Sequence, residues 1–483
     1  MNTRPLRRTP RALLLALLSA ATLVAACDTD DDPVAPRAEF PLAFDGALTS
    51  LWAPSVAEDI VLTPGAALGV LPATGGRIAP GYYVWDSWPV RTPDGAIARV
   101  GGWYVLVALT ARDTLLPGAR HGAAELRYLV SRDGADWQLG GRVFEAGTAV
   151  GSAQWAGSTV YDSATGRVRV FYTAIGYGDI RPDGSDPTAG ENKDASRQRL
   201  VMATGTLVAA PNGVSMGDWG EHRVILEPDG RWYEQRAAAD GIWAFRDPWY
   251  FRDPRSGRSF LLFTANLGFV DPAAPSVVRL WPEQATLFRG SRPGGPRFSH
   301  GGNDGPTPDV TANGAVGLAI AETPDLTQWR LLPPLLGAPG VNSQLERPHF
   351  VWRDNRYYLF FSSHAFTFQA PLSGPDGLYG FVADSLTGLY LPLNGTGLVA
   401  GNPSAAPLQT YSYLVLPSGR VTSYVGYQNL GGVGLAGIAQ QSPAWQREHF
   451  GGTLAPTFSI SISGQRTTLG GFDPTGSFRL LAP

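Results

Sequence analysis

The sequence predicts an all-β fold, and within that class a five-bladed β-propeller. The 59 glycines and 40 prolines among 483 residues fall as short breaks between apolar runs. Charged residues make up only 16% and hydrophobic residues 44%, which argues against long exposed helices and against disorder. From residue 41 onward, a turn followed by an aromatic, β-branched strand recurs, and such internal repetition is typical of propellers. A large β-sandwich with unrelated hairpins is the alternative.

The first forty residues indicate export. An arginine-containing start precedes an apolar run at 12–26, shorter than the roughly 20 residues that span a bilayer and typical of a cleaved signal. The run ends in Val-Ala-Ala before Cys27, which resembles a bacterial lipobox, in which the cysteine becomes the acylated N-terminus. We therefore expect a signal peptide at 1–26 and a lipid anchor in the cell envelope, with secretion as the alternative. Residues 27–40 predict a flexible acidic tether, and 41–483 the propeller.

Charge and cysteine content limit the partners. The net charge is −3 and the isoelectric point about 6.1, so no basic excess exists for nucleic-acid phosphates, and we exclude that partner. Cys27 is the only cysteine, so no disulfide forms within one chain. We expect a monomer that contacts the membrane through its N-terminal lipid anchor alone.

Five similar hairpin arms follow one another along the chain. In each arm a turn of two residues, such as Gly101-Gly102 or Ser418-Gly419, precedes a strand rich in aromatic and β-branched residues. The strands of these arms are expected at 103–111, 167–174, 258–266, 356–363 and 420–427. Their spacing is irregular, which predicts long insertions between them.

The segment before each arm would form the strand nearest the propeller axis, and three such segments carry a carboxylate among aromatic residues. These carboxylates are Asp86, Asp247 and Glu346. Burying a carboxylate costs free energy unless the group is paired or used. Because equivalent positions of a propeller converge on its axis, we expect the three to meet in one axial pocket. Local ion pairs of Asp247 with Arg246 and of Glu346 with Arg347 are the structural alternatives.

Such a pocket suits sugar chemistry. Two carboxylates that flank a glycosidic bond can act as a nucleophile and as an acid, and apolar surroundings raise the pKa of the acid. Aromatic rings offer flat faces to sugar C–H groups. Arg246 could bind a hydroxyl group or hold a carboxylate ionised.

Three blocks of this sequence resemble the signature blocks of glycoside hydrolase family 68, which comprises levansucrases, inulosucrases and related fructosidases. The blocks are WDSWP at 85–89, RDP at 246–248 and ERP at 346–348. The likeness runs through most of residues 41–483. The first and third blocks are specific, whereas the RDP triplet also occurs in related five-bladed families that act on sucrose or arabinan. The family fold is a five-bladed propeller, as the repeats predict.

The resemblance implies a role for each carboxylate. Asp86 would be the nucleophile that forms a covalent fructosyl intermediate. Glu346 would be the general acid that releases glucose and then the base that activates the acceptor. Asp247 would hold fructose hydroxyl groups and stabilise the oxocarbenium-like transition state.

The resemblance also implies which residues line the sucrose pocket. Trp85, Trp155 and Arg246 would line this pocket. Gln344, His364 and Tyr411 would lie near the glucosyl or acceptor subsite. Gln344 stands where Gram-negative members commonly carry Gln, and His364 where several of them carry His. Without the family, His364 would be a surface residue and Tyr411 a core residue.

Two departures from the family pattern have consequences. Ala156 stands where the family usually has a serine that hydrogen-bonds the nucleophile, so this support is missing or another group supplies it. Ser343 stands where Gram-positive members have a calcium-binding aspartate, so we expect no calcium there. We expect no other metal and no cofactor, and the segment 301–309 should be a loop rather than a metal site.

These observations favour an exported fructosyltransferase that cleaves sucrose with retention and passes fructose to a fructan, another sugar acceptor or water. A mainly hydrolytic β-fructofuranosidase is the nearest alternative. A non-catalytic glycan-binding lipoprotein is a third, and a propeller for protein interaction a fourth.

Overall fold

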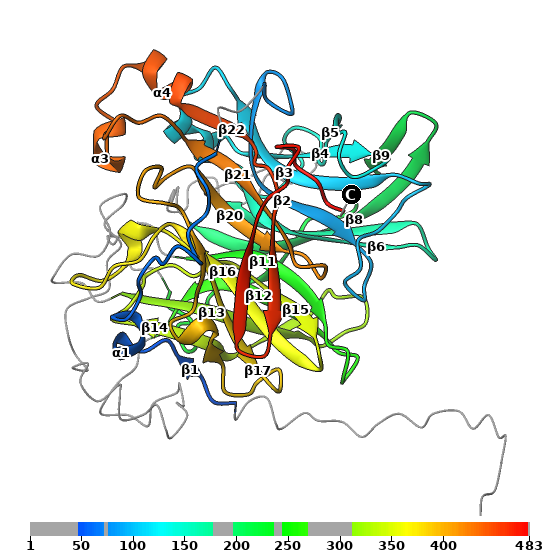
Figure 1. Ribbon diagram of the computed structural model, residues 1–483. Helices are drawn as coiled ribbons and strands as arrows, with labels where there is room; N and C mark the ends of the chain where they lie inside the picture. The colour runs from blue at the N-terminus through cyan, green and yellow to red at the C-terminus, as the bar shows by residue number, and fades with distance from the viewer. Residues whose placement is uncertain (1–46, 72–75, 177–196, 236–243, 269–311, 482–483) are drawn as a thin grey trace, which may run out of the picture. The chain divides into compact units, whose positions relative to one another are not determined.

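The computed structural model describes residues 47–71, 76–176, 197–235, 244–268 and 312–481. Strands dominate this part of the chain, and its helices are short (Figure 1). The all-β class is therefore confirmed. The predicted signal peptide, tether and Cys27 lie outside the described residues, as does the predicted loop 301–309.

The strands fall into five consecutive antiparallel groups along the chain. The first contains β2 (Tyr82–Arg91), β3 (Tyr104–Arg112), β4 (Glu125–Ser131) and β5 (Gln138–Arg142). The second contains β6 (Ala153–Asp162), β7 (Arg167–Ile175), β8 (Gln198–Ala210), β9 (Gly213–Gly217) and β10 (Arg223–Leu226). The third contains β11 (Phe245–Arg252), β12 (Ser259–Asn266), β13 (Asn313–Ala321) and β14 (Trp329–Pro339).

The last two groups complete the described strands. The fourth contains β15 (Glu346–Arg353), β16 (Arg356–Ser363), β17 (Gly377–Ala383), β18 (Leu391–Pro392) and β19 (Leu398–Gly401). The fifth contains β20 (Thr410–Val415), β21 (Arg420–Tyr427), β22 (Phe450–Leu454), β23 (Phe458–Ser463) and β24 (Arg466–Phe472). The short strand β1 (Ser50–Leu51) adds to the third group, parallel to β14.

Short helices connect some of these strands. The α-helices among the described residues are α1 (Pro54–Ala57), α3 (Leu435–Ile438) and α4 (Pro443–His449). The 3₁₀ helices are η1 (Pro117–Ala123), η2 (Ala365–Thr367) and η3 (Leu393–Gly395). No described helix has the length and hydrophobicity that a membrane crossing requires.

All five predicted arms are strands. They are β3, β7, β12, β16 and β21, and their ends differ by at most one residue from the expected ranges. Each pairs with the strand that precedes it, as expected. Hydrogen bonding joins the described strands into four sheets, because the parallel pairing of β2 with β6 merges the first two groups into one sheet. The blade count of five stays a prediction.

A β-bulge interrupts the first strand of every group at a corresponding place. The register against the second strand shifts between Val84 and Ser87, Trp155 and Gly157, Arg246 and Trp249, Glu346 and His349, and Tyr411 and Leu414. Three bulge residues have positive φ without being glycine, namely Asp247 (64°), Arg347 (52°) and Ser412 (61°). Bulges bend a strand and re-aim its side chains, and they are common next to active sites.

At three bulges, a backbone N–H group that does not pair within its own sheet donates a hydrogen bond to a hydroxyl group of a neighbouring strand. The bonds run from Asp247 N to Thr173 Oγ1 (2.8 Å), from Arg347 N to Thr264 Oγ1 (3.0 Å) and from Tyr413 N to Ser362 Oγ (2.9 Å). Each hydroxyl belongs to the second strand of the preceding group. A buried N–H without a partner costs free energy, so these bonds both stabilise the bulges and join successive groups.

The last group also contacts the beginning of the described chain. Leu480 N donates to Gly134 O at 2.9 Å, and the Phe478 ring packs against Trp137 in the first group. Ile78 N donates to Thr453 Oγ1 in the fifth group at 3.0 Å. The segment after β24 thus contacts the first group and the segment before β2 contacts the fifth, as in a closed propeller.

Candidate active site

One pocket gathers all the residues that the sequence analysis placed in a sucrose site. The lining residues include Trp85, Asp86, Trp155, Arg246, Asp247, Gln344, Glu346, His364 and Tyr411. The cavity is about 460 Å³, within the range of small-molecule sites. Most of these residues lie on the first strands of the five groups, whereas Gln344 precedes β15 and His364 follows β16. The expected convergence of Asp86, Asp247 and Glu346 is therefore confirmed, while their individual roles stay predictions.

The three carboxylates do not occupy one repeat position, contrary to our expectation. Glu346 is the first residue of β15 and pairs with Ser362 of β16 just before the bulge. Asp247 follows the corresponding residue, Arg246, by one position in β11. Asp86 follows Val84 by two positions in β2. Because a bulge turns successive side chains in new directions, residues at three different steps reach the same pocket.

Arg246 connects two of the carboxylates. Its Nη2 atom donates to Glu346 Oε1 at 2.6 Å, and its Nε atom lies 3.7 Å from Asp247 Oδ2. The side chain is only 6% exposed, and its Nη1 atom is buried without a hydrogen-bond partner in the described residues. The predicted local pair with Asp247 exists, but the shorter bond reaches Glu346 in a different group. Such charge-assisted bonds are stronger than neutral ones and fix geometry.

Asp247 is held in place from two further sides. Thr264 Oγ1 donates to Asp247 Oδ2 at 2.9 Å, and the Arg347 N–H donates to the same oxygen at 3.3 Å. Burial raises the pKa of Asp247 to about 6, and the negative charges of Glu346 and Asp86 add to the rise, although Arg246 opposes it. This carboxyl group therefore titrates near pH 6 and is mostly ionised above it.

Glu346 accepts a short hydrogen bond from the Tyr411 hydroxyl at Oε2, on the side away from Arg246. His364 Nε2 lies 3.9 Å from the same oxygen. Burial acts to raise the pKa of Glu346, but Arg246 and then His364 outweigh it and bring the pKa below its usual value. Glu346 is therefore ionised in this arrangement.

His364 is fixed by a carboxylate that the sequence analysis missed. Asp376, which is 3% exposed, accepts from His364 Nδ1 at 2.8 Å and from the Ala365 N–H at 2.7 Å. The imidazole lies between the rings of Tyr411 and Phe366, at 3.5 Å and 4.7 Å between centroids. Burial acts to lower the pKa of His364, but Asp376 and Glu346 together raise it above its usual value.

Arg347 does not form the predicted local pair with Glu346. Its guanidinium donates to Ser412 O at 3.0 Å and to Ser87 O at 2.8 Å, and it also contacts the Ser412 hydroxyl. It therefore links the fourth group to the fifth and the first, directly beside the carboxylates. The local-pair alternative for Glu346 is wrong, because the bulge turns the two neighbouring side chains toward different strands.

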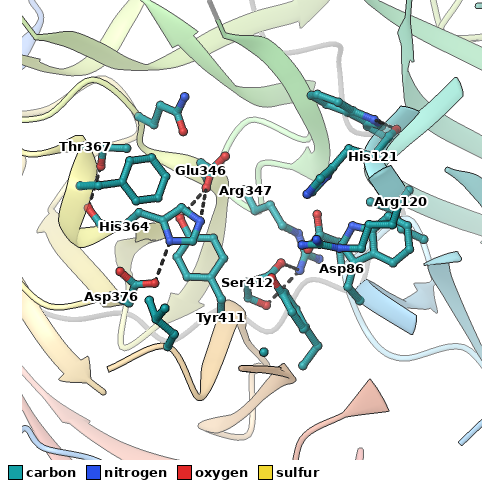
Figure 2. Close-up of a pocket in the computed structure, with 18 of the residues that line it drawn as sticks. Asp86, Arg120, His121, Glu346, Arg347, His364, Thr367, Asp376, Tyr411 and Ser412 are labelled. Carbon is teal, nitrogen blue, oxygen red and sulfur yellow. Dashed lines mark hydrogen bonds and ion pairs between the residues drawn. The ribbon is translucent and has the colours of Figure 1, made fainter. Parts of the chain in front are cut away.

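The nucleophile candidate faces a wall built by helix η1. Figure 2 shows Asp86, Arg120 and His121 on one side of the pocket and Glu346, His364, Asp376 and Tyr411 on the other. Neither Arg120 nor His121 was expected from sequence. Ala156 is fully buried and its carbonyl accepts from Thr173 Oγ1 at 3.0 Å. Within the described residues no hydrogen bond reaches the Asp86 carboxylate, so none replaces the family's usual serine.

The neighbourhood of Gln344 and Ser343 is fixed through main-chain contacts. Gln344 N donates to Asn342 Oδ1 at 2.9 Å, and its carbonyl accepts from Ser363 Oγ at 2.7 Å. Ser343 Oγ donates to Thr367 O at 3.3 Å. The described part of the chain contains no cluster of three or more His, Cys, Asp or Glu side chains placed to hold a metal ion. The absence of calcium stays a prediction.

A strand-built pocket with converging carboxylates, a guanidinium between two of them and aromatic walls defines a carbohydrate-processing enzyme of the propeller class. The chain belongs to the Levansucrase/Invertase family, glycoside hydrolase family 68, whose sequence model matches residues 45–476.

Curated relatives and solved structures agree with this family. A levansucrase of Pseudomonas savastanoi pv. glycinea is 35% identical over 402 residues, covering 80% of this chain and 85% of the relative. A levansucrase of Zymomonas mobilis is 34% identical over 395 residues, covering 80% and 82%. The inulosucrase from Halalkalicoccus jeotgali bound to kestose is 42% identical with a TM-score of 0.76, covering 89% of this chain and 97% of that one.

A further structural neighbour carries a different name. The full-length β-fructofuranosidase from Microbacterium saccharophilum K-1 is 26% identical with a TM-score of 0.69, covering 90% of this chain and 85% of that one. The similar proteins therefore include levansucrases, an inulosucrase and a β-fructofuranosidase.

Proposed function

We propose that this protein is a retaining fructosyltransferase that cleaves sucrose and transfers the fructosyl unit through a covalent intermediate on Asp86. The observation that carries the proposal is the convergence of Asp86, Asp247 and Glu346 in one pocket of a family 68 chain. Levansucrase relatives and an inulosucrase neighbour support a transferase.

The first step breaks the bond between the fructosyl anomeric carbon and the glucosyl oxygen. A carboxylate oxygen of Asp86 forms a new bond to that carbon, and Glu346, once it carries a proton, gives that proton to the departing oxygen. Asp247 lies beside Arg246 in the same pocket and, once ionised, stabilises the positive charge that develops on the sugar ring. Glucose then leaves with its new hydroxyl group.

The second step reverses these roles. Glu346, now ionised, takes the proton of an acceptor hydroxyl, whose oxygen attacks the anomeric carbon and displaces Asp86. Two displacements restore the original configuration. A sugar acceptor gives a longer fructan, and water gives free fructose.

Separate measurements of free glucose and free fructose test the proposal. The purified full chain incubated with sucrose should release glucose in clear excess over fructose, because transferred fructose does not appear free. Glu346→Gln should lose turnover by about 10² to 10⁴-fold, as expected for loss of a general acid, while it keeps its fold. Release of neither sugar by folded protein would overturn the proposal.

A mainly hydrolytic β-fructofuranosidase is the second candidate. The name of the Microbacterium neighbour, a β-fructofuranosidase, supports it. Equal release of glucose and fructose would decide for this candidate. Family membership and the curated relatives do not support a non-catalytic glycan-binding protein.

A further inference from the structure

Helix η1 places one side chain, His121, in the wall of the pocket beside the nucleophile candidate. The helix connects β3 to β4, and three contacts fix its position. The Arg120 guanidinium lies over the Trp85 ring at 5.4 Å and over the Phe450 ring at 4.8 Å. Trp155 Nε1 donates to the His121 carbonyl at 2.9 Å. The backbone at His121 is thus tied to Trp155 and the neighbouring Arg120 side chain to Trp85, and both tryptophans line the pocket with Asp86.

The imidazole of His121 stands between those two tryptophans. Its centroid is 6.0 Å from the Trp85 ring and 6.0 Å from the Trp155 ring, with edge-to-face geometry at both. The residue is exposed and lines the cavity, and neither ring nitrogen has a hydrogen-bond partner in the described residues. Figure 2 shows the ring projecting into the pocket across from Glu346 and His364.

The surroundings of His121 keep the ring neutral. Its enclosure by the pocket wall lowers its pKa well below the usual value, and the positive charge of Arg120 lowers it further. A neutral imidazole has one N–H donor and one nitrogen acceptor. A sugar presents hydroxyl groups that both donate and accept, so this pair of ring atoms complements neighbouring hydroxyl groups without adding a charge.

We propose that His121 is a specificity-determining residue that hydrogen-bonds hydroxyl groups of the sugar bound between Asp86 and Glu346. The inference rests on the proposed function, because it takes sucrose as the bound sugar. It adds a neutral polar contact on the nucleophile side, opposite the charged cluster of Glu346, His364 and Asp376. The competing explanation is that the ring only packs between Trp85 and Trp155.

Two substitutions separate these explanations. His121→Phe keeps an aromatic ring between the tryptophans but removes both polar atoms. His121→Asn removes the ring but keeps a donor and an acceptor on a short side chain. Both are made in the Glu346→Gln background, where sucrose binding is measured by calorimetry without turnover. His449→Phe is the matched control, because this histidine stacks on Trp445 and does not line the pocket.

We expect His121→Phe to weaken sucrose binding about tenfold, the effect of one to two lost hydrogen bonds, and His121→Asn to bind more tightly than His121→Phe. The control should bind as the parent does, and the thermal midpoints of all variants should agree. If the ring of His121 only packs, His121→Phe should bind sucrose more tightly than His121→Asn. Wild-type affinity in His121→Phe, or an Asn variant that binds no more tightly than the Phe variant, overturns the inference.

The same experiment distinguishes failure of this inference from failure of the proposed function. If the Glu346→Gln parent binds no sucrose and the wild type releases no glucose, the proposed function fails. If the parent binds sucrose and His121→Phe binds it equally well, only the role of His121 fails.

Discussion

Glu346 and His364 are neighbouring titratable groups. The pKa of Glu346 lies below its usual value and that of His364 above it, so a single proton on the pair resides on the imidazole. His364 Nε2 is 3.9 Å from Glu346 Oε2. The proton that the leaving glucosyl oxygen needs is therefore stored next to the general acid, and the two groups titrate as a pair.

Asp376 controls how firmly that proton is held. It accepts from His364 Nδ1 at 2.8 Å and raises the pKa of His364 by its negative charge. Asp376→Asn removes the charge, so the pair should lose its proton at a lower pH. We expect the alkaline limb of the kcat/KM profile to move toward lower pH, with little change on the acid side.

The control for this prediction is Asp384→Asn. Asp384 is 82% exposed and pairs with Arg356 at 2.9 Å, away from the pocket. Its profile should coincide with that of the wild type. An alkaline limb that stays in place in Asp376→Asn would mean that His364 does not share the catalytic proton.

The repeat pattern found the three carboxylates, and the family resemblance added Gln344 and His364, which lie outside the strands. Neither found His121 or Asp376. Asp86, Asp247 and Glu346 stand out because a carboxylate in an aromatic strand breaks a recognisable pattern. His121 and Asp376 lie in segments without such a pattern, and only tertiary packing brings them to the pocket. The number of residues that separate His121 from Asp86, or Asp376 from Glu346, does not show that these side chains lie in one pocket.

At the scale of elements, the sequence predicted the five arm strands but not the bulges that offset the three carboxylates. The arms follow from a recurring turn and the run of aromatic and β-branched residues after it, and all five are strands. The bulges depend on which buried N–H finds a hydroxyl in the neighbouring group, for example Arg347 N at Thr264. The sequence of a single strand does not show which hydroxyl group accepts this hydrogen bond. The offset of the three carboxylates therefore had to come from the structure.

His349 is a second link between the fourth and fifth groups, and its removal should destabilise the fold. The residue is fully buried, its Nε2 accepts from Val415 N at 2.9 Å, and its Nδ1 lies 2.9 Å from Arg347 O. His349→Leu leaves both backbone groups unpaired. We expect the free energy of unfolding, measured in urea at pH 7, to fall by about 2–4 kcal/mol.

The pH dependence of this effect provides its check. Burial lowers the pKa of His349 to about 3, so the unfolded chain binds more protons than the folded one between pH 3 and the usual value of 6.5. The stabilisation is complete above pH 6.5 and is lost as the pH falls. The difference between wild type and His349→Leu should therefore narrow toward pH 3. His449→Leu, at a partly exposed site, should change stability by less than about 0.5 kcal/mol.

At the scale of the whole molecule, closure of the ring fixes the pocket. The five first strands supply the site, so the site depends on all five groups holding their mutual positions. Contacts between the fifth group and the first, such as Leu480 N with Gly134 O at 2.9 Å, complete that arrangement. Arg347 performs the same task inside the pocket, where it reaches Ser412 and Ser87.

The attachment of this molecule to the cell envelope is a separate question, and the sequence predicts a lipid on Cys27. An apolar run of signal-peptide length ends in Val-Ala-Ala directly before this residue, the only cysteine of the chain. We propose that processing makes Cys27 the N-terminal residue and acylates it. Because an acylated cysteine has no free thiol, protein purified from membranes should not react with a maleimide. It should carry label from radioactive palmitate fed to the cells.

Cys27→Ser is the variant that tests this anchor. It should lose the palmitate label and leave the membrane fraction, while it releases glucose from sucrose as the wild type does, because Cys27 lies outside the pocket-forming strands. A two-chain anchor holds a protein stably on a bilayer, so a shift into the soluble fraction is the expected result of losing it. Wild-type protein that is unlabelled, soluble and reactive with maleimide would instead indicate that Cys27 remains unmodified. That result would favour secretion after ordinary cleavage.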